Sequence, residues 1–233
     1  GIFTVGCAGG VKCDIEIPIN FESNDKSSYC FGVYGLMGGH SGIDINKGRA
    51  NSNKLLARAL NILSKDIDLS LNKIEGGAKD NAIPREAEAI ISINDKDLDL
   101  LQEKIKDLEK IYKIEYKNTD PNLHLKLEKV ENQQKALCKD DFNKILTSLM
   151  ILPNGVQTNL VESSINLGVI KTSEDKIEIV ASIRSALSSK KEFIMEQIEL
   201  YLKSIGGSII FRGSYPAWEY NANSVIRDKC IKV

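Results

Sequence analysis

The chain has 233 residues, of which 27% are charged, and its formal net charge is −1 at pH 7. This length can bury a sizeable core, as one large domain or two small ones. The balanced charge argues against a nucleic-acid-binding protein, which usually shows a basic excess, and no apolar run approaches the roughly 18 residues that cross a bilayer. We therefore expect a soluble, cytoplasmic protein that binds neither nucleic acid nor membranes.

The chain begins at Gly1 rather than Met, and we expect both ends to have been cut from something longer. Its five cysteines are widely spaced, and no two of them form a C-x-x-C pair of the kind found in zinc ribbons and redox motifs. We expect reduced thiols of a cytosolic protein. The cysteines are Cys7, Cys13, Cys30, Cys138 and Cys230.

Apolar residues alternate with period two where we expect strands, and recur at three-to-four spacing where we expect helices. In chain order the sequence predicts strands at 11–21 and 28–37, a helix at 51–65, strands at 67–74 and 87–93, a helix at 98–112, a strand at 123–127, a helix at 142–149, strands at 164–170 and 176–183, a helix at 193–205 and a strand at 209–211. Lys190 and Lys191, which open the last helix after two serines, are expected at the surface.

The order strand, strand, helix, strand occurs twice, over roughly 67–130 and 164–213. Such a recurrence indicates a partial internal duplication. The sequence therefore predicts an α+β fold, with one or two antiparallel sheets, helices on one face, and partly duplicated ferredoxin-like units.

Gly38-Gly39-His40-Ser41-Gly42 is the most informative short segment. Glycines permit positive φ and close approach, so the loop can hold an imidazole in a fixed direction. The other histidine, His124, is expected to be solvated on a strand. We interpret His40 as half of an active site; the alternative is a turn histidine that bonds nearby backbone.

Several segments, in order along nearly the whole chain, resemble the lid domain of carnosinase-type co-catalytic zinc peptidases, and most closely that of the bacterial aminoacyl-histidine dipeptidases (peptidase D, Xaa-His dipeptidases). The segments are 38–45 with 48–51, 76–77 with 81–85, 152–156, 161–168 and 215–218. The stretch 155–161 departs from the family pattern, because it is several residues shorter than the usual loop.

In that family a catalytic domain holds two zinc ions through histidines and carboxylates, a glutamate acts as general base, and the lid is inserted into the catalytic sequence. The resemblance implies that residues 1–10 and 216–233 belong to the catalytic domain. Residues 11–215 would be the lid, with pseudo-repeats at about 11–132 and 133–215. No metal ligand is expected in this chain, the two zinc ions belong to the full-length enzyme, and the lid alone should be inactive.

The resemblance also implies the site residues. His40 would donate to the oxyanion of the transition state, Asn81 would supply an amide to the substrate, and Arg184 would pair with the substrate carboxylate. The alternatives are a turn-capping role for Asn81 and a surface ion pair for Arg184. The implied partners are an Xaa-His dipeptide, the catalytic domain of the same parent chain and, through lid surfaces, a second copy.

Two other functions stay open at this stage. A stand-alone small-molecule-binding or regulatory module could use the same ferredoxin-like units, because a fold does not determine a function. A dimerisation domain is compatible with the lid interpretation.

Overall fold

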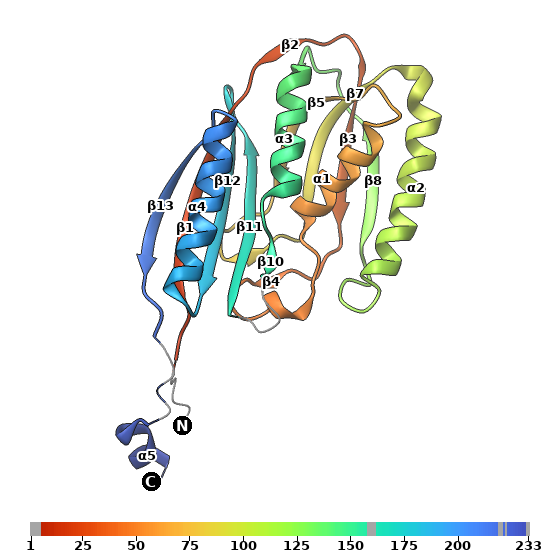
Figure 1. Cartoon of the computed structure of the whole chain (residues 1–233). Coiled ribbons are helices and arrows are strands. Elements are labelled where there is room, and N and C mark those ends of the chain that lie inside the picture. The colour runs from red at the N-terminus through yellow and green to blue at the C-terminus, as the bar shows by residue number, and fades with distance from the viewer. Residues whose placement is uncertain (1–5, 158–161, 219–220, 222, 232–233) are drawn as a thin grey trace.

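The computed structural model describes residues 6–157, 162–218, 221 and 223–231. Within these residues, nine strands form one antiparallel sheet. Figure 1 shows the long helices on one face of this sheet. They are α1 (Ser52–Leu63), α2 (Leu98–Glu115), α3 (Lys139–Ile151) and α4 (Ser188–Ser204). The predicted α+β class, with an antiparallel sheet covered by helices on one side, is confirmed.

One half of the sheet is a complete ferredoxin-like unit. Its strands lie in the order β5-β7-β3-β8, and in the chain they alternate with α1 and α2 as β-α-β-β-α-β. The strands are β3 (Ser27–Tyr34), β5 (Ser70–Gly76), β7 (Ala87–Ile93) and β8 (His124–Lys129).

The other half has the same connectivity, with its first strand taken from the start of the chain. The order β13-β1-β12-β11 repeats the first unit if β1 is counted before α3. These strands are β1 (Gly9–Pro18), β11 (Ser163–Thr172), β12 (Lys176–Ser185) and β13 (Ser208–Tyr215). The first unit is thus inserted between β1 and α3, and the two units join where β5 pairs with β11, Ile170 opposite Gly76.

This arrangement confirms the duplicated strand, strand, helix, strand order. The domain division into pseudo-repeats at about 11–132 and 133–215 stays a prediction, and the sheet places β1 among strands of the second half. The expected catalytic-domain segments 1–10 and 216–233 lie partly outside the described residues, as do residues 158–161 of the short loop.

Several short elements escaped the sequence pattern because two or three residues cannot show a period. β2 (Phe21–Ser23) pairs with β9 (Lys135–Leu137), β4 (Gly39–His40) pairs with β6 (Ala82–Ile83), and β10 (Gly155–Val156) pairs with β11. Two 3-10 turns, Ile45–Lys47 and Asp95–Asp97, and helix α5 (Val225–Ile231) complete the described chain.

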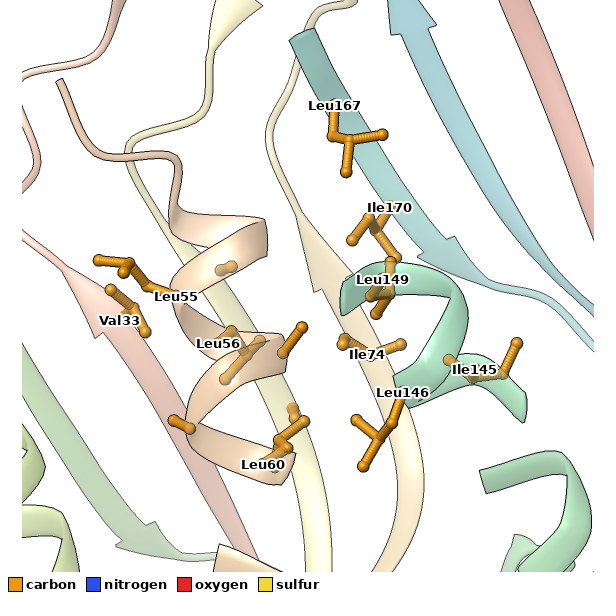
Figure 2. Packing of buried hydrophobic residues seen from close by; sticks show 14 of the residues in the cluster. Val33, Leu55, Leu56, Leu60, Ile74, Ile145, Leu146, Leu149, Leu167 and Ile170 are labelled. Carbon is orange, nitrogen blue, oxygen red and sulfur yellow. The ribbon is translucent and has the colours of Figure 1, made fainter. Parts of the chain in front are cut away.

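The core fills the space between the helices and the sheet and continues across the junction of the two units. In Figure 2, Leu56 and Leu60 of α1 lie beside Leu149 of α3, over the junction strands that carry Ile74 and Leu167. All five side chains are buried. Burying each such side chain stabilises the fold by about 1.5–3 kcal/mol, so the two units are expected to unfold as one body.

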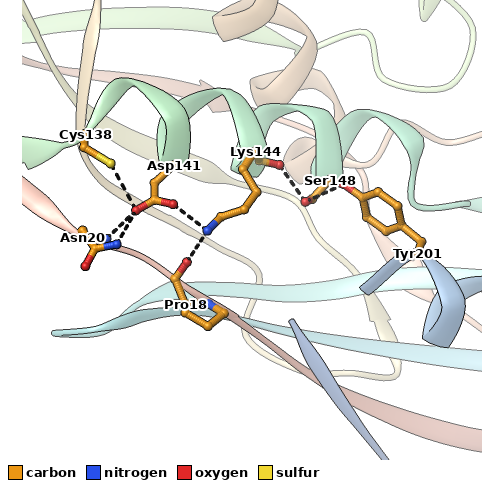
Figure 3. Close-up of polar contacts among 7 residues, drawn as sticks. All are labelled: Pro18, Asn20, Cys138, Asp141, Lys144, Ser148 and Tyr201. Carbon is orange, nitrogen blue, oxygen red and sulfur yellow. Dashed lines mark hydrogen bonds and ion pairs between the residues drawn. The ribbon is translucent and has the colours of Figure 1, made fainter. Parts of the chain in front are cut away.

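A buried carboxylate fastens the start of α3 to the segment after β1 (Figure 3). Asp141 accepts hydrogen bonds from the Asn20 backbone nitrogen at 2.6 Å and from its side-chain amide at 3.0 Å. Lys144 pairs with the other carboxylate oxygen at 2.5 Å, and the Cys138 thiol donates to the carboxylate at 3.2 Å. Burial by itself raises the pKa of Asp141, but these donors outweigh it and lower the pKa to about 2.

Asp141→Asn is expected to destabilise the fold by about 1 kcal/mol at pH 7, because an amide nitrogen replaces one acceptor among the surrounding donors. The folded pKa lies below the unfolded value of roughly 3.9, so the unfolded chain binds the proton more tightly. The stabilisation is therefore complete above about pH 4 and is lost as the pH falls through about 2.

Urea unfolding of the wild type and of Asp141→Asn at pH 7 and pH 3 measures this stabilisation. The exposed neighbour Asp140→Asn is the control, and a difference between Asp141→Asn and wild type that grows toward low pH would contradict it.

Candidate functional site

The loop that carries His40 begins after β3 and ends at α1, whose N-cap is Asn51. Gly38 and Gly39 have φ of 61° and 141°, which favour glycine. A Cβ at Gly38 would lie 2.3 Å from Cγ of Arg85, so a larger residue does not fit there. His40 itself pairs with Ala82 in the small β4-β6 ladder.

One buried carboxylate closes this loop. Asp120, which is 1% exposed, accepts the backbone N–H of Met37 at 2.8 Å and that of Ala50 at 2.9 Å, one on each oxygen. The two ends of the loop are therefore held together by a single side chain from the segment between α2 and β8. The sequence reasoning missed Asp120, because an aspartate before Pro121 looks like an ordinary turn residue.

Asp44 holds the backbone of His40 from inside the loop. Its carboxylate accepts the His40 backbone N–H at 2.9 Å and forms ion pairs with Lys47 at 2.6 Å and Arg49 at 3.7 Å. The hydrogen bond from Lys47, followed by that from the His40 backbone, lowers the pKa of Asp44. The carboxylate therefore stays ionised at neutral pH and keeps its hydrogen bond to the His40 backbone and its ion pairs with Lys47 and Arg49.

The imidazole of His40 is exposed and has a defined direction. Its Nδ1 accepts the backbone N–H of Gly42 at 3.1 Å. In the neutral ring this bond assigns the proton to Nε2, which is then a hydrogen-bond donor. The local bond expected of a turn histidine is thus present, and it uses only one of the two ring nitrogens.

Asn81 lies in the turn before β6 and is exposed. Its backbone oxygen accepts from the Ser41 N–H at 2.9 Å, which ties this turn to the histidine loop. In the described part of the chain its side-chain amide makes no hydrogen bond to the turn backbone.

Arg184 projects from β12 on the face of the sheet opposite the helices, since its neighbour Ile183 is buried in the core. Its Nη1 donates to the Tyr215 hydroxyl at 3.2 Å, and its buried Nε has no acceptor among the residues that the structure describes. Arg184 forms no ion pair with any residue that the structure describes. The alternative role in a surface ion pair is therefore not found in this part of the chain.

The histidine loop of the first unit meets Arg184 of the second at Gly42. A Cβ on Gly42 would lie 3.0 Å from Cζ of Arg184 and 3.1 Å from Cε1 of His40. Asn81 and Arg184 also line one cavity of about 310 Å³, which they share with Lys12, Arg212 and Tyr215. Asn81 and Arg184 therefore line the same cavity, and His40 lies close to Arg184 at Gly42. The three residues come from three separate segments of the chain.

His124 lies elsewhere. It stacks on Tyr34 with ring centroids 5.7 Å apart and is exposed on β8, as expected. No group of three or more His, Cys, Asp or Glu side chains in the described ranges is arranged to hold a metal ion. These residues therefore do not fit a zinc site. No described helix is long and apolar enough to cross a membrane.

The expectation for Lys191 was wrong. Its side chain is buried, and its ammonium donates to the Ser214 hydroxyl and the Tyr215 carbonyl, both at 3.1 Å. The reason is that Lys191 lies three residues before Ile194 and seven before Ile198, which places it on the buried face of α4. Lys191 thus fastens α4 to the end of β13, beside the cavity.

Comparison with known proteins matches this chain to peptidases. Residues 31–120 match the model of the peptidase dimerisation domain (M20_dimer). The chain is 34% identical over 234 residues to the cytosol non-specific dipeptidase of Escherichia coli K12, covering 97% of this chain and 48% of that protein. Its structure superposes on that of aminoacylhistidine dipeptidase from Vibrio alginolyticus with a TM-score of 0.92 and 31% identity, covering 96% of this chain and 47% of the other.

The chain spans about half the length of the relatives it matches. The match to the family model lies within the first ferredoxin-like unit and the histidine loop, whereas the two relatives match both units. Residues 31–120 are therefore similar to the peptidase dimerisation domain, and the chain as a whole is similar to about half of a bacterial dipeptidase.

Proposed function

We propose that this chain is the lid and substrate clamp of a cytoplasmic, zinc-dependent dipeptidase that cleaves dipeptides, Xaa-His dipeptides among them. The observation that carries the proposal is the guanidinium of Arg184, which forms no ion pair within the described residues, lies against the His40 loop and lines a cavity large enough for a small ligand. "Parent enzyme" below means the full-length protein to which such a lid would belong.

Arg184 provides the recognition of the substrate carboxylate. Within the described ranges Arg184 has no carboxylate partner and its buried Nε has no acceptor, which leaves a hydrogen-bonding deficit of about 1–3 kcal/mol. A bound carboxylate would meet it, because the planar fork of arginine can bond both oxygens. A free C-terminal carboxylate within reach of the cleaved bond distinguishes a dipeptide from a longer peptide.

His40 provides the donor for the reacting carbonyl. Attack of water on the peptide carbon builds negative charge on the carbonyl oxygen, and a preorganised donor aimed at that charge stabilises the transition state. The Nε2–H of His40 suits this role because its partner nitrogen is already bonded to Gly42, which determines the ring's direction. Asn81 lies beside it and would donate its amide to the substrate.

The clamp would close through the paired connections at the base of the sheet. The backbones of Cys7 and Trp218 exchange two hydrogen bonds, each 2.8 Å long. Figure 1 shows these two connections leaving the sheet side by side below β1 and β13. A narrow two-stranded junction of this kind can act as a hinge for a domain that closes over a substrate.

The zinc ions and the general base would be supplied by the catalytic domain of the parent enzyme, since the described residues do not fit a metal site. A homodimer is part of the proposal, and the matched dimerisation-domain model supports it.

The test is to assay the parent enzyme and this chain side by side on dipeptides. We expect the parent enzyme to hydrolyse them, to lose activity with a chelator and to regain it with zinc, while this chain with added zinc is inactive. Zinc-dependent hydrolysis by this chain alone would reject the proposal. If the parent enzyme cleaves no dipeptide while this chain binds small carboxylates, a stand-alone binding module is the better description.

A further inference from the structure

We propose that the hydroxyl of Tyr215 is a second donor to the substrate carboxylate and also holds Arg184 in place to bind it. This inference rests on the proposed function, and it adds to that function a residue for which the sequence pattern assigned no role.

The hydroxyl and the guanidinium form one donor pair at the cavity. The Tyr215 oxygen accepts from Nη1 of Arg184 at 3.2 Å, and its own O–H does not take part in that bond. Across the described residues, no acceptor receives that O–H. Both side chains line the same 310 Å³ cavity, and Tyr215 is 42% exposed. The pair thus offers a charged and a neutral donor side by side to a bound anion.

The ring of Tyr215 packs on the backbone of β1. Gly10 of β1 lies opposite Tyr215 of β13, next to a register shift between Gly10 and Lys12. A Cβ on Gly10 would lie 2.6 Å from the Tyr215 hydroxyl oxygen and 2.7 Å from Cζ. The ring therefore crosses β1 over a bare backbone, which lets its hydroxyl reach Arg184 on the next strand.

The backbone of Tyr215 is held from the other side of the sheet. Lys191 of α4 donates to the Tyr215 carbonyl and to the neighbouring Ser214 hydroxyl, each at 3.1 Å. With the strand end fastened and the ring lying on Gly10, the hydroxyl has a defined position before any ligand arrives. Preorganised donors of this kind bind an anion without the cost of ordering them first.

The chemistry of the pair favours a carboxylate over a neutral amide. A hydroxyl that already accepts from a cation becomes a stronger donor, because hydrogen bonds in a chain polarise one another. A carboxylate can accept from both groups at once, whereas a C-terminal amide has one oxygen and presents its own donors to the guanidinium. Tyr215 should therefore contribute to selection of free dipeptides over their amides.

The test is Tyr215→Phe in the parent enzyme, which removes one oxygen and leaves the ring on Gly10. We expect KM for a dipeptide to rise about tenfold or more, as for a lost hydrogen bond to a charged group, with kcat changed by less than about twofold. KM for the matching C-terminal dipeptide amide should change much less. The ratio of kcat/KM for the dipeptide to kcat/KM for the amide should therefore fall.

Tyr201→Phe is the matched control. It removes a phenol hydroxyl that is hydrogen-bonded to the Ser148 hydroxyl at 2.9 Å, between α4 and α3 (Figure 3), and Tyr201 does not line the cavity. We expect unchanged kinetics on both substrates. An unchanged KM in Tyr215→Phe overturns the inference, and so does an equal loss on dipeptide and amide, which would indicate a structural role only. Absence of dipeptide hydrolysis by the wild-type parent enzyme would instead reject the proposed function itself.

Discussion

Replacing His40 by alanine in the parent enzyme is expected to lower kcat by about a hundredfold or more at unchanged zinc content. The expected loss is large because the donor acts on charge that develops only in the transition state, so KM should change little. Loop folding should survive the substitution, since Asp120 and Asp44 bind backbone N–H groups of the loop and not the imidazole.

The control for this variant is His124→Ala. It removes the second histidine of this chain, which is exposed on β8 and stacked on Tyr34. Its kinetics should match wild type. Metal analysis of both variants separates the two roles a histidine could have. If His40→Ala retains its zinc and keeps kcat within about threefold of wild type, the transition-state role is wrong, and if it loses zinc, His40 is a ligand instead.

Replacing Arg184 by methionine is expected to lower kcat/KM for dipeptides by roughly 30- to 1,000-fold, as when one partner of a hydrogen-bonded charge pair is truncated at about 2–4 kcal/mol. The loss should appear mainly in KM, because the carboxylate does not change charge during the reaction. Arg184→Lys keeps the charge but lacks the planar fork, so it should recover only part of the loss.

The stability of Arg184→Met provides a second readout. Arg184 forms no ion pair in the described part of the chain and leaves its Nε unsatisfied, so methionine should cost the fold little. Arg212→Met is the control from the same cavity. Its guanidinium is already paired with Asp14 at 2.5 Å, which makes it a poorer partner for a substrate, and its effect on KM should be small. Equal effects of the two variants would show that the cavity senses only general positive charge.

Much of the fold could be predicted from the sequence, because strand and helix periods are local. The four long helices and the eight long strands all lie where apolar spacing places them, within a few residues at most ends. The errors are at boundaries: β3 ends at Tyr34 and not at 37, and α4 begins at Ser188 and not at 193. Lys191 was expected at the surface because it is charged, although its spacing from Ile194 and Ile198 places it on the buried face of α4.

The candidate site was less predictable. His40 is set apart by its glycines, whose positive φ is a property of the local chain. Asn81 and Arg184 came from the family resemblance, and their roles stay proposals. Asp120 and Tyr215 were not predicted as site residues, because their partners lie far away in the chain and neither contact has a local signature.

The sequence by itself determined where the strands and helices lie, which of their faces are apolar, and that a glycine-rich loop presents a histidine. Only the tertiary structure decided that β1 joins the second unit, that β5 pairs with β11, and that the His40 loop therefore rests against Arg184 across Gly42. The physical reason is that side-chain period and turn chemistry depend on near neighbours, whereas strand pairing depends on how two distant apolar faces share one core.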